Sequence, residues 1–167
     1  MQESGRVPGR LTQQERAALL EQLRSAPRRL EEAVEGLDHA ALFTRWLPEE
    51  WTVAQNVHHV ADAHLNAFSR MKMALCAERP HLEPYDQDLW AKTPDAATAP
   101  IEWSLDLIRA VHARWHALLA DLPDDAWART ARHGEMGDVT LESLLAYYAR
   151  HGDVHVAQIQ QTLAARD

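Results

Sequence analysis

Apolar residues recur every three or four positions in four segments of the chain, which is the spacing of one buried face of an α-helix. The segments cover about residues 12–37, 52–77, 104–122 and 140–165. Almost no stretch alternates apolar and polar residues in the way that predicts a β-strand. The pattern therefore predicts an all-α protein built from four long helices, with no β-sheet.

Local sequence signals refine two of these helices. Thr12-Gln-Gln-Glu15 and Thr52-Val-Ala-Gln55 both have the form of a capping box. In this motif the threonine and the acid or amide three residues later bind free backbone N–H groups at the start of a helix. Pro27 interrupts the first segment and should kink or split it, because proline lacks a backbone N–H and crowds the preceding turn.

The second and third segments are separated by a long connection, Glu78–Ile101, which holds four of the eight prolines of the chain. Connections of this length in compact domains are usually functional or are crossovers. A long crossover allows the two helices that it joins to run parallel. We therefore expect a four-helix bundle in up-down-down-up order, forming one domain over residues 1–167, with residues 1–11 as a flexible N-terminal arm.

Composition limits the classes of function. The chain has 167 residues, of which 46% are apolar and 25% charged, as in ordinary globular domains. The net charge is -8, with 17 basic and 25 acidic residues and no dense run of Lys or Arg, which argues against nucleic-acid and anionic-membrane partners. No apolar stretch approaches the roughly 20 residues of a membrane span. With the single cysteine Cys76 and no signal-peptide core in MQESGRVPGR, we expect a cytoplasmic protein.

Two histidines, His151 and His155, stand four residues apart in the fourth segment, on the apolar face with Tyr148 and Ile159. Residues i and i+4 share one face of a helix, so the two rings should be neighbours inside the bundle. Two charged, unpaired imidazoles would be unfavourable there, whereas a divalent metal binds neutral imidazoles. The alternative is a pair of core or rim histidines without a metal, because this spacing is also common by chance.

A second pair, His112 and His116, has the same spacing in the third segment, so spacing alone does not rank the two pairs. We expect His112 and His116 not to share a metal. The apolar face of their helix, carried by Ile108, Val111 and Trp115, already has a packing role.

A catalytic metal site needs a third protein ligand and an open position. The second segment offers His58, His59 and His64. His64 lies in the apolar stripe and is most simply explained by packing. His58 and His59 flank that stripe on opposite sides, and periodicity does not choose between them.

Four stretches together point to a known family. They read WTVAQNVHHVADAHLNAFSRMKMAL, PYDQDLWAKTPD, VHARWHALLADL and HGDVHVAQI. Their order and spacing resemble the DinB superfamily, and specifically its YfiT-like branch, over about residues 12–165. The resemblance implies an up-down-down-up bundle that holds one divalent metal, zinc or nickel, through three histidines. Carried over to this chain, the metal ligands are His59, His151 and His155.

The resemblance also implies an activity. The family is described as metal-dependent hydrolases, in which the metal activates a water molecule, and we expect that function first. Several relatives act instead as thiol S-transferases that use bacillithiol, mycothiol or glutathione. A bundle that binds a metal or small ligand without turnover is a further alternative. The expected partner is a small-molecule substrate, including a low-molecular-weight thiol for the transferase, and the expected assembly is a homodimer, as in many relatives.

Further residues are candidates for supporting roles. Asp62, one turn after His59, is a candidate general base or a partner that orients a ligand ring; the alternative is a solvated aspartate. Tyr85, Asp86 and Trp90 lie on the long connection and could close over a pocket. For Trp90 we favour simple packing, because large aromatic side chains mostly serve that purpose.

Overall fold

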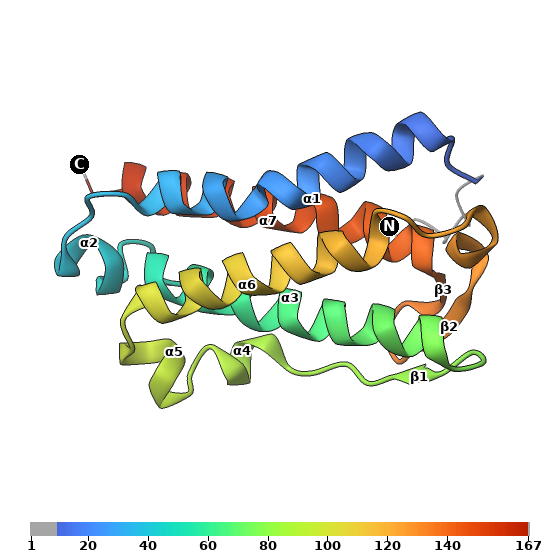
Figure 1. Cartoon of the computed structure of the whole chain (residues 1–167). Helices are drawn as coiled ribbons and strands as arrows, with labels where there is room; N and C mark the ends of the chain where they lie inside the picture. The colour runs from blue at the N-terminus through green and yellow to red at the C-terminus, as the bar shows by residue number, and fades with distance from the viewer. Residues whose placement is uncertain (1–9, 167) are drawn as a thin grey trace, which may run out of the picture.

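A computed structural model describes residues 10–166 of the chain. Four long helices lie side by side along most of its length (Figure 1). They are α1 (Gln13–Val34), α3 (Val53–Cys76), α6 (Ile101–Leu119) and α7 (Leu141–Ala164). α3 and α6 run in one direction and α1 and α7 in the other, which confirms the predicted up-down-down-up bundle. No described helix has an apolar stretch long enough to cross a membrane.

Three of the four long helices begin where the sequence places them. Thr12 and Thr52 both form complete capping boxes, and Thr140 forms a third with Ser143 at the start of α7. α6 begins and ends three residues before the predicted 104–122, directly after Pro100. Residues 1–9 of the predicted arm lie outside the described residues. Leu11, the last residue of the predicted arm, donates its backbone N–H to the Glu142 carboxylate over 3.0 Å.

Pro27 does not split α1, which continues through it as one helix, with the proline buried. Because Pro27 has no N–H, the carbonyl of Leu23 lacks the helical donor that normally lies four residues later. The ring of His112 on α6 takes that place, with Nδ1 2.7 Å from the Leu23 oxygen. A partner from a neighbouring helix thus satisfies the carbonyl that the proline leaves open.

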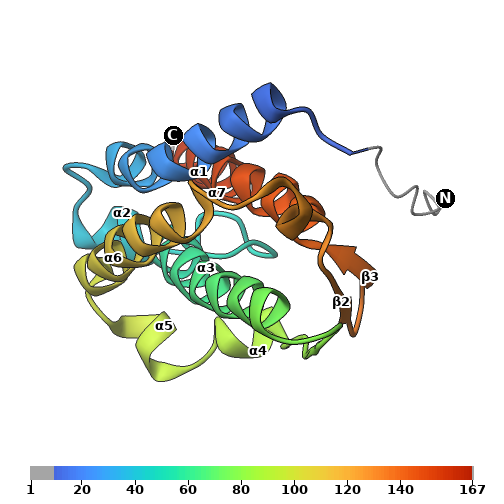
Figure 2. The ribbon, with the colours of Figure 1, turned by 45° about the vertical axis from the view of Figure 1, so that its right-hand side comes forward.

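The structure contains a small sheet, so the expectation of no β-sheet is wrong. Strand β1 (His81–Leu82) pairs in parallel with β2 (Thr130–His133), which pairs antiparallel with β3 (Gly137–Thr140). The sheet lies at the end of the bundle where α3 ends and α7 begins (Figure 2). Strands of two to four residues are too short to show a clear alternation.

The connection between α3 and α6 returns along the length of the bundle, as the parallel helices require (Figure 1). After β1 it forms two short helices, α4 (Gln87–Trp90) and α5 (Pro94–Thr98). The remaining short elements are α2 (His39–Phe43), between α1 and α3, and the 3-10 helix η1 (Asp124–Ala128), between α6 and β2. The crossover therefore covers one side of α3 with ordered chain.

The hydrophobic core consists of two clusters that occupy different halves of the bundle. The first includes Leu23, Met71 and Leu145, and the second includes Val57 and Ile159. On α3 the second cluster extends to residue 61 and the first begins at residue 67; on α7 the first ends at residue 149. His64 on α3 and His151 and His155 on α7 lie between the two clusters, and His59 lies close to them, so a polar layer crosses the middle of the bundle.

Candidate metal centre

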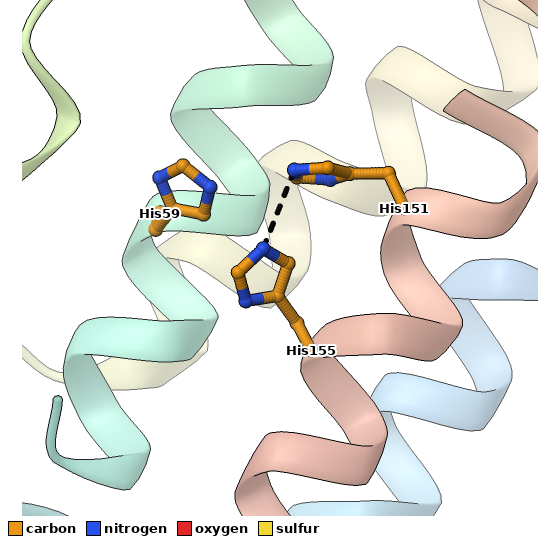
Figure 3. Close-up of side chains that lie close together, drawn as sticks. All are labelled: His59, His151 and His155. Carbon is orange, nitrogen blue, oxygen red and sulfur yellow. Dashed lines mark hydrogen bonds between the residues drawn. The ribbon is translucent and has the colours of Figure 1, made fainter. Parts of the chain in front are cut away.

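Three histidines from two helices meet in this middle layer (Figure 3). His59 comes from α3, and His151 and His155 come from successive turns of α7. One ring nitrogen from each histidine can be chosen so that all three lie within 4.8 Å of one another. The ring centroids are 5.3 Å apart for His59 and His151, and 4.6 Å apart for the other two pairs. The structure thus brings together the three side chains that the resemblance singled out.

The orientation of His155 is fixed by an amide. Asn56 Nδ2 donates to the Thr52 carbonyl over 3.0 Å, so Asn56 Oδ1 is the atom that faces His155 Nδ1, at 2.9 Å. An amide oxygen only accepts, so we assign the proton of the neutral His155 ring to Nδ1. The Nε2 lone pair of His155 therefore points toward His151, whose Nε2 is 3.3 Å away.

Burial keeps all three rings neutral at pH 7. Desolvation lowers the pKa of His59 to about 3, of His151 to about 3 and of His155 to about 4; for His59 and His151 the charges of neighbouring histidines add to the effect. His59 Nε2 is buried and has no hydrogen-bond partner among residues 10–166. A buried polar atom without a partner is unfavourable. Neutral imidazoles with converging lone pairs are the ligands that a divalent metal binds, so the residues fit such an ion.

The neighbouring histidine on α3 is turned away. His58 Nδ1 lies 2.7 Å from Ser104 Oγ and its Nε2 lies 3.2 Å from the Ala99 carbonyl, so the ring joins α3 to the start of α6. The choice between His58 and His59, which periodicity left open, is thus made by the packing of α3 against its neighbours.

The rival pair on α6 has other contacts. His112 places Nδ1 on the Leu23 carbonyl and Nε2 2.7 Å from His64 Nδ1, so both of its nitrogens face protein groups. Within residues 10–166, the only cluster of three or more potential metal ligands is the one around His59. His64 itself is fully buried in the core, as its place in the apolar stripe indicated.

Asp62 does not orient a ring of the cluster. Among the described residues, the only hydrogen bond of Asp62 with another side chain is made by its backbone carbonyl, which accepts from Asn66. Burial, with a smaller contribution from the charge of Asp95, raises the pKa of Asp62 to about 6. The side chains that contact ring nitrogens of the cluster are instead Asn56 and His64, which sequence reasoning did not assign to the site. The sequence did contain a signal for them, since both are polar residues at positions of the helix that face the interior.

Two cavities flank the histidine cluster. One, of about 200 Å³, is lined by His155, Asn56 and Trp51 together with acidic side chains. The other, of about 180 Å³, is lined by His59 and His151 together with several aromatic side chains. The cluster can therefore be approached by small molecules from two sides.

Of the three crossover residues named from the sequence, only Tyr85 lines the second cavity, and the three have different roles. Tyr85 lines the cavity wall. Trp90 packs on Tyr85 with ring centroids 4.2 Å apart, and it is 40% exposed. Asp86 caps α4 by accepting from the Leu89 N–H over 2.9 Å. Trp90 thus packs on Tyr85 within the crossover.

A buried arginine also lines the second cavity. Arg70 is only 8% exposed, and it donates to the Glu83 carbonyl and, over 3.4 Å, to the Tyr148 hydroxyl. Its guanidinium lies 5.8 Å from the centre of the Tyr85 ring. No carboxylate within residues 10–166 forms a salt bridge with it. Buried charges are normally paired, so this cation is available for an anionic group in the cavity.

Comparison with known proteins places these features in a family. The family model described as the DinB superfamily matches residues 22–159. A protein of Oceanobacillus iheyensis named "Putative metal-dependent hydrolase OB0782" is 38% identical over 148 residues, 89% of this chain and 86% of that protein. One of Geobacillus kaustophilus, named "Putative metal-dependent hydrolase GK0616", is 44% identical over 138 residues, with coverage of 82% and 78%.

A solved structure has the same fold. YfiT from Bacillus subtilis, described as "a probable metal-dependent hydrolase with an unusual four-helix bundle topology", superposes with a TM-score of 0.89 at 34% identity. The match covers 95% of this chain and 90% of that one.

Proposed function

Because this chain belongs to the DinB superfamily, we propose that it is a metal-dependent hydrolase in which His59, His151 and His155 hold one divalent ion. The observation that carries the proposal is the cluster itself. Its three rings are neutral, lie in the polar layer of the bundle and present ring nitrogens within 4.8 Å of one another. The names of the relatives in Oceanobacillus and Geobacillus support the same class of activity.

A divalent ion with three histidine ligands keeps a position open and lowers the pKa of a water there toward neutrality. The residues of the chain supply the remaining requirements. Asn56 holds His155 in the orientation that exposes Nε2. Asp62 has a pKa raised to about 6, which suits a group that accepts a proton near pH 7, and we propose it as the general base. All-imidazole ligation suits both zinc and nickel.

The substrate that we propose is a small molecule with an anionic group. Arg70 lies in the wall of the cavity that also holds His59 and His151, and no carboxylate of the described residues pairs with it. A carboxylate or phosphate of the substrate would bind this guanidinium through charge-assisted hydrogen bonds. The net charge of -8 makes nucleic acid an unsuitable substrate.

A second candidate, metal-dependent thiol S-transfer, is favoured by the two cavities. A transferase must bring a thiol and an electrophile to the metal together, and the cluster has one cavity on each side. A metal in the cluster would deprotonate a bound thiol just as it would a bound water. Arg70 would then hold a carboxylate of the thiol.

Turnover assays distinguish these functions. The zinc- and nickel-loaded proteins should hydrolyse members of a panel of carboxylate-bearing esters and amides, and His155→Ala should abolish that activity. Conjugation of glutathione, mycothiol or bacillithiol to a model electrophile, measured in parallel, tests the transferase. Metal binding without turnover in either panel would refute both enzymatic proposals and leave a binding protein. A protein that binds no divalent metal would refute both enzymatic proposals and the metal-binding alternative.

We also propose that the protein is a homodimer in the cytoplasm. The single cysteine supports a reducing compartment, since no intramolecular disulfide can form. Light scattering coupled to size-exclusion chromatography tests the assembly. A monomer mass at micromolar concentration would contradict it.

A further inference from the structure

A line of three histidines leads from the metal centre into the core. His151 Nδ1 lies 3.1 Å from His64 Nε2, and His64 Nδ1 lies 2.7 Å from His112 Nε2. His112 Nδ1 lies 2.7 Å from the Leu23 carbonyl oxygen. We call His151, His64 and His112 the histidine chain. It connects α7, α3, α6 and α1, so all four long helices of the bundle take part.

The last contact sets the direction of every hydrogen bond in the histidine chain. A carbonyl oxygen only accepts, so His112 Nδ1 must carry a proton and donate it to Leu23. In a neutral ring the other nitrogen then accepts, so His64 Nδ1 must donate to His112 Nε2. By the same step His151 Nδ1 must donate to His64 Nε2. One acceptor at the end of the line therefore fixes the tautomers of three rings.

The argument requires neutral rings, and burial supplies them. His64 is completely buried and His112 is 2% exposed. Desolvation lowers the pKa of His112 to about 4 and holds the pKa of His64 well below its ordinary value. The acceptor exists because Pro27 removes the helical donor for Leu23. The line ends at a backbone carbonyl, which cannot take up a proton, so it holds protons in place and does not conduct them to solvent.

We propose that His64 and His112 are positioning residues, which lock His151 in the Nδ1–H tautomer and so direct its Nε2 lone pair into the three-histidine cluster. Asn56 fixes the same tautomer in His155 through a separate hydrogen bond, which it accepts from His155 Nδ1. Both rings of α7 thus present Nε2 before a metal arrives. With these tautomers the two Nε2 atoms, 3.3 Å apart, are both acceptors and share no proton, so a cation bound between them would supply the missing partner. The benefit to metal binding rests on the proposed function, whereas the tautomers are a property of the folded protein alone.

Preorganisation of this kind lowers the cost of binding. A ring that can hold its proton on either nitrogen loses this freedom when a metal binds, which reduces the free energy of binding. A ring already fixed in the binding tautomer loses nothing. Removing partners that orient a metal-ligating histidine typically weakens metal affinity about 10–100-fold. His112 stands two rings away from the cluster, so we expect an effect near the lower end of that range.

Nuclear magnetic resonance of the metal-free protein tests the tautomers directly. Long-range ¹H–¹⁵N correlation of the imidazole nitrogens at pH 7 should show protonated Nδ1 and unprotonated Nε2 for His64, His112 and His151. A protonated Nε2 on any of these three rings overturns the proposal. Because no metal is present, the result does not depend on whether the proposed function is correct.

A matched pair of variants tests the consequence for the metal. His112→Phe removes a buried ring of the histidine chain, and His58→Phe removes an equally buried ring whose two contacts lie outside it. We expect the dissociation constant for zinc to rise about tenfold in His112→Phe and less than about threefold in His58→Phe. Equal effects of the two variants, or no effect of His112→Phe, would overturn the proposal. If His112→Phe does not fold, the spectra of the wild type decide.

Discussion

The metal-free protein should lose stability steeply as the pH falls below neutrality. Four buried rings have pKa values lowered to about 3 or 4, those of His59, His112, His151 and His155. In the unfolded chain each has its ordinary value of 6.5. Between these values the unfolded state binds protons that the folded state does not, so the free energy of unfolding falls as the pH falls through about 6.5.

The size of the effect follows from the same values. Each ring lowers the free energy of unfolding by about 2 kcal/mol between pH 7 and pH 5, because in this range the ring binds a proton in the unfolded protein but not in the folded protein. Four rings give about 6 to 8 kcal/mol, which is comparable with the whole stability of a typical domain. Asp62 acts in the opposite direction, since burial raises its pKa to about 6, but it is a single, partly exposed group.

Urea unfolding at pH 7 and pH 5, with a chelator present to keep the protein free of metal, measures this loss of stability. Tryptophan fluorescence reports the unfolding. His59→Leu should reduce the difference between the two pH values by about 2 kcal/mol. His116→Gln, which replaces a partly exposed histidine outside the polar layer, should leave it unchanged. A wild-type difference below about 2 kcal/mol would refute the reasoning, because the buried rings would then titrate as they do in the unfolded chain.

Three further outcomes follow from the site. Asn56→Leu should weaken zinc binding about 10–100-fold, measured by competition with a chromogenic chelator, because His155 Nδ1 loses its acceptor; unchanged affinity would show that this contact does not orient the ring. Arg70→Gln should raise KM for esters with a carboxylate at least about tenfold while leaving neutral esters unaffected; an equal change for both would exclude the anion role. Chelation should lower Tm of the wild type but not of His155→Ala, since the metal binds only the folded arrangement; an equal shift in both would place the metal elsewhere.

The helices could be predicted because their signals are local. Thr12 and Thr52 mark helix starts by motifs that depend only on the next three residues, and each apolar stripe extends over several turns. The sheet could not be predicted in the same way, because β1 has two residues and pairs with β2 about 50 positions later in the chain. The continuity of α1 through Pro27 depends likewise on His112, a residue from another helix.

The site shows the same division between local and long-range information. His151 and His155 share a face of one helix, so their proximity follows from spacing alone. His58 and His59 flank the same stripe, and only the packing of α3 between α6 and α7 turns one ring toward Ser104 and the other toward the cluster. Family resemblance supplied this choice in advance.

Arg70 and the tautomer of His151 carried no sequence signal. The role proposed for Arg70 depends on a crossover that brings Tyr85 and Glu83 back to α3. The tautomer proposed for His151 depends on a carbonyl of α1. Both properties arise from groups on several elements, so no single stretch of sequence contains them.

The central claim is that His59, His151 and His155 bind one divalent ion, and the metal content of four purified variants tests it most directly. After zinc loading and gel filtration, elemental analysis should find one zinc per chain in the wild type and in His58→Ala. It should find none in His59→Ala, His151→Ala or His155→Ala, with circular dichroism confirming that each variant is folded. Loss of zinc in His58→Ala together with retention in folded His59→Ala would contradict the account.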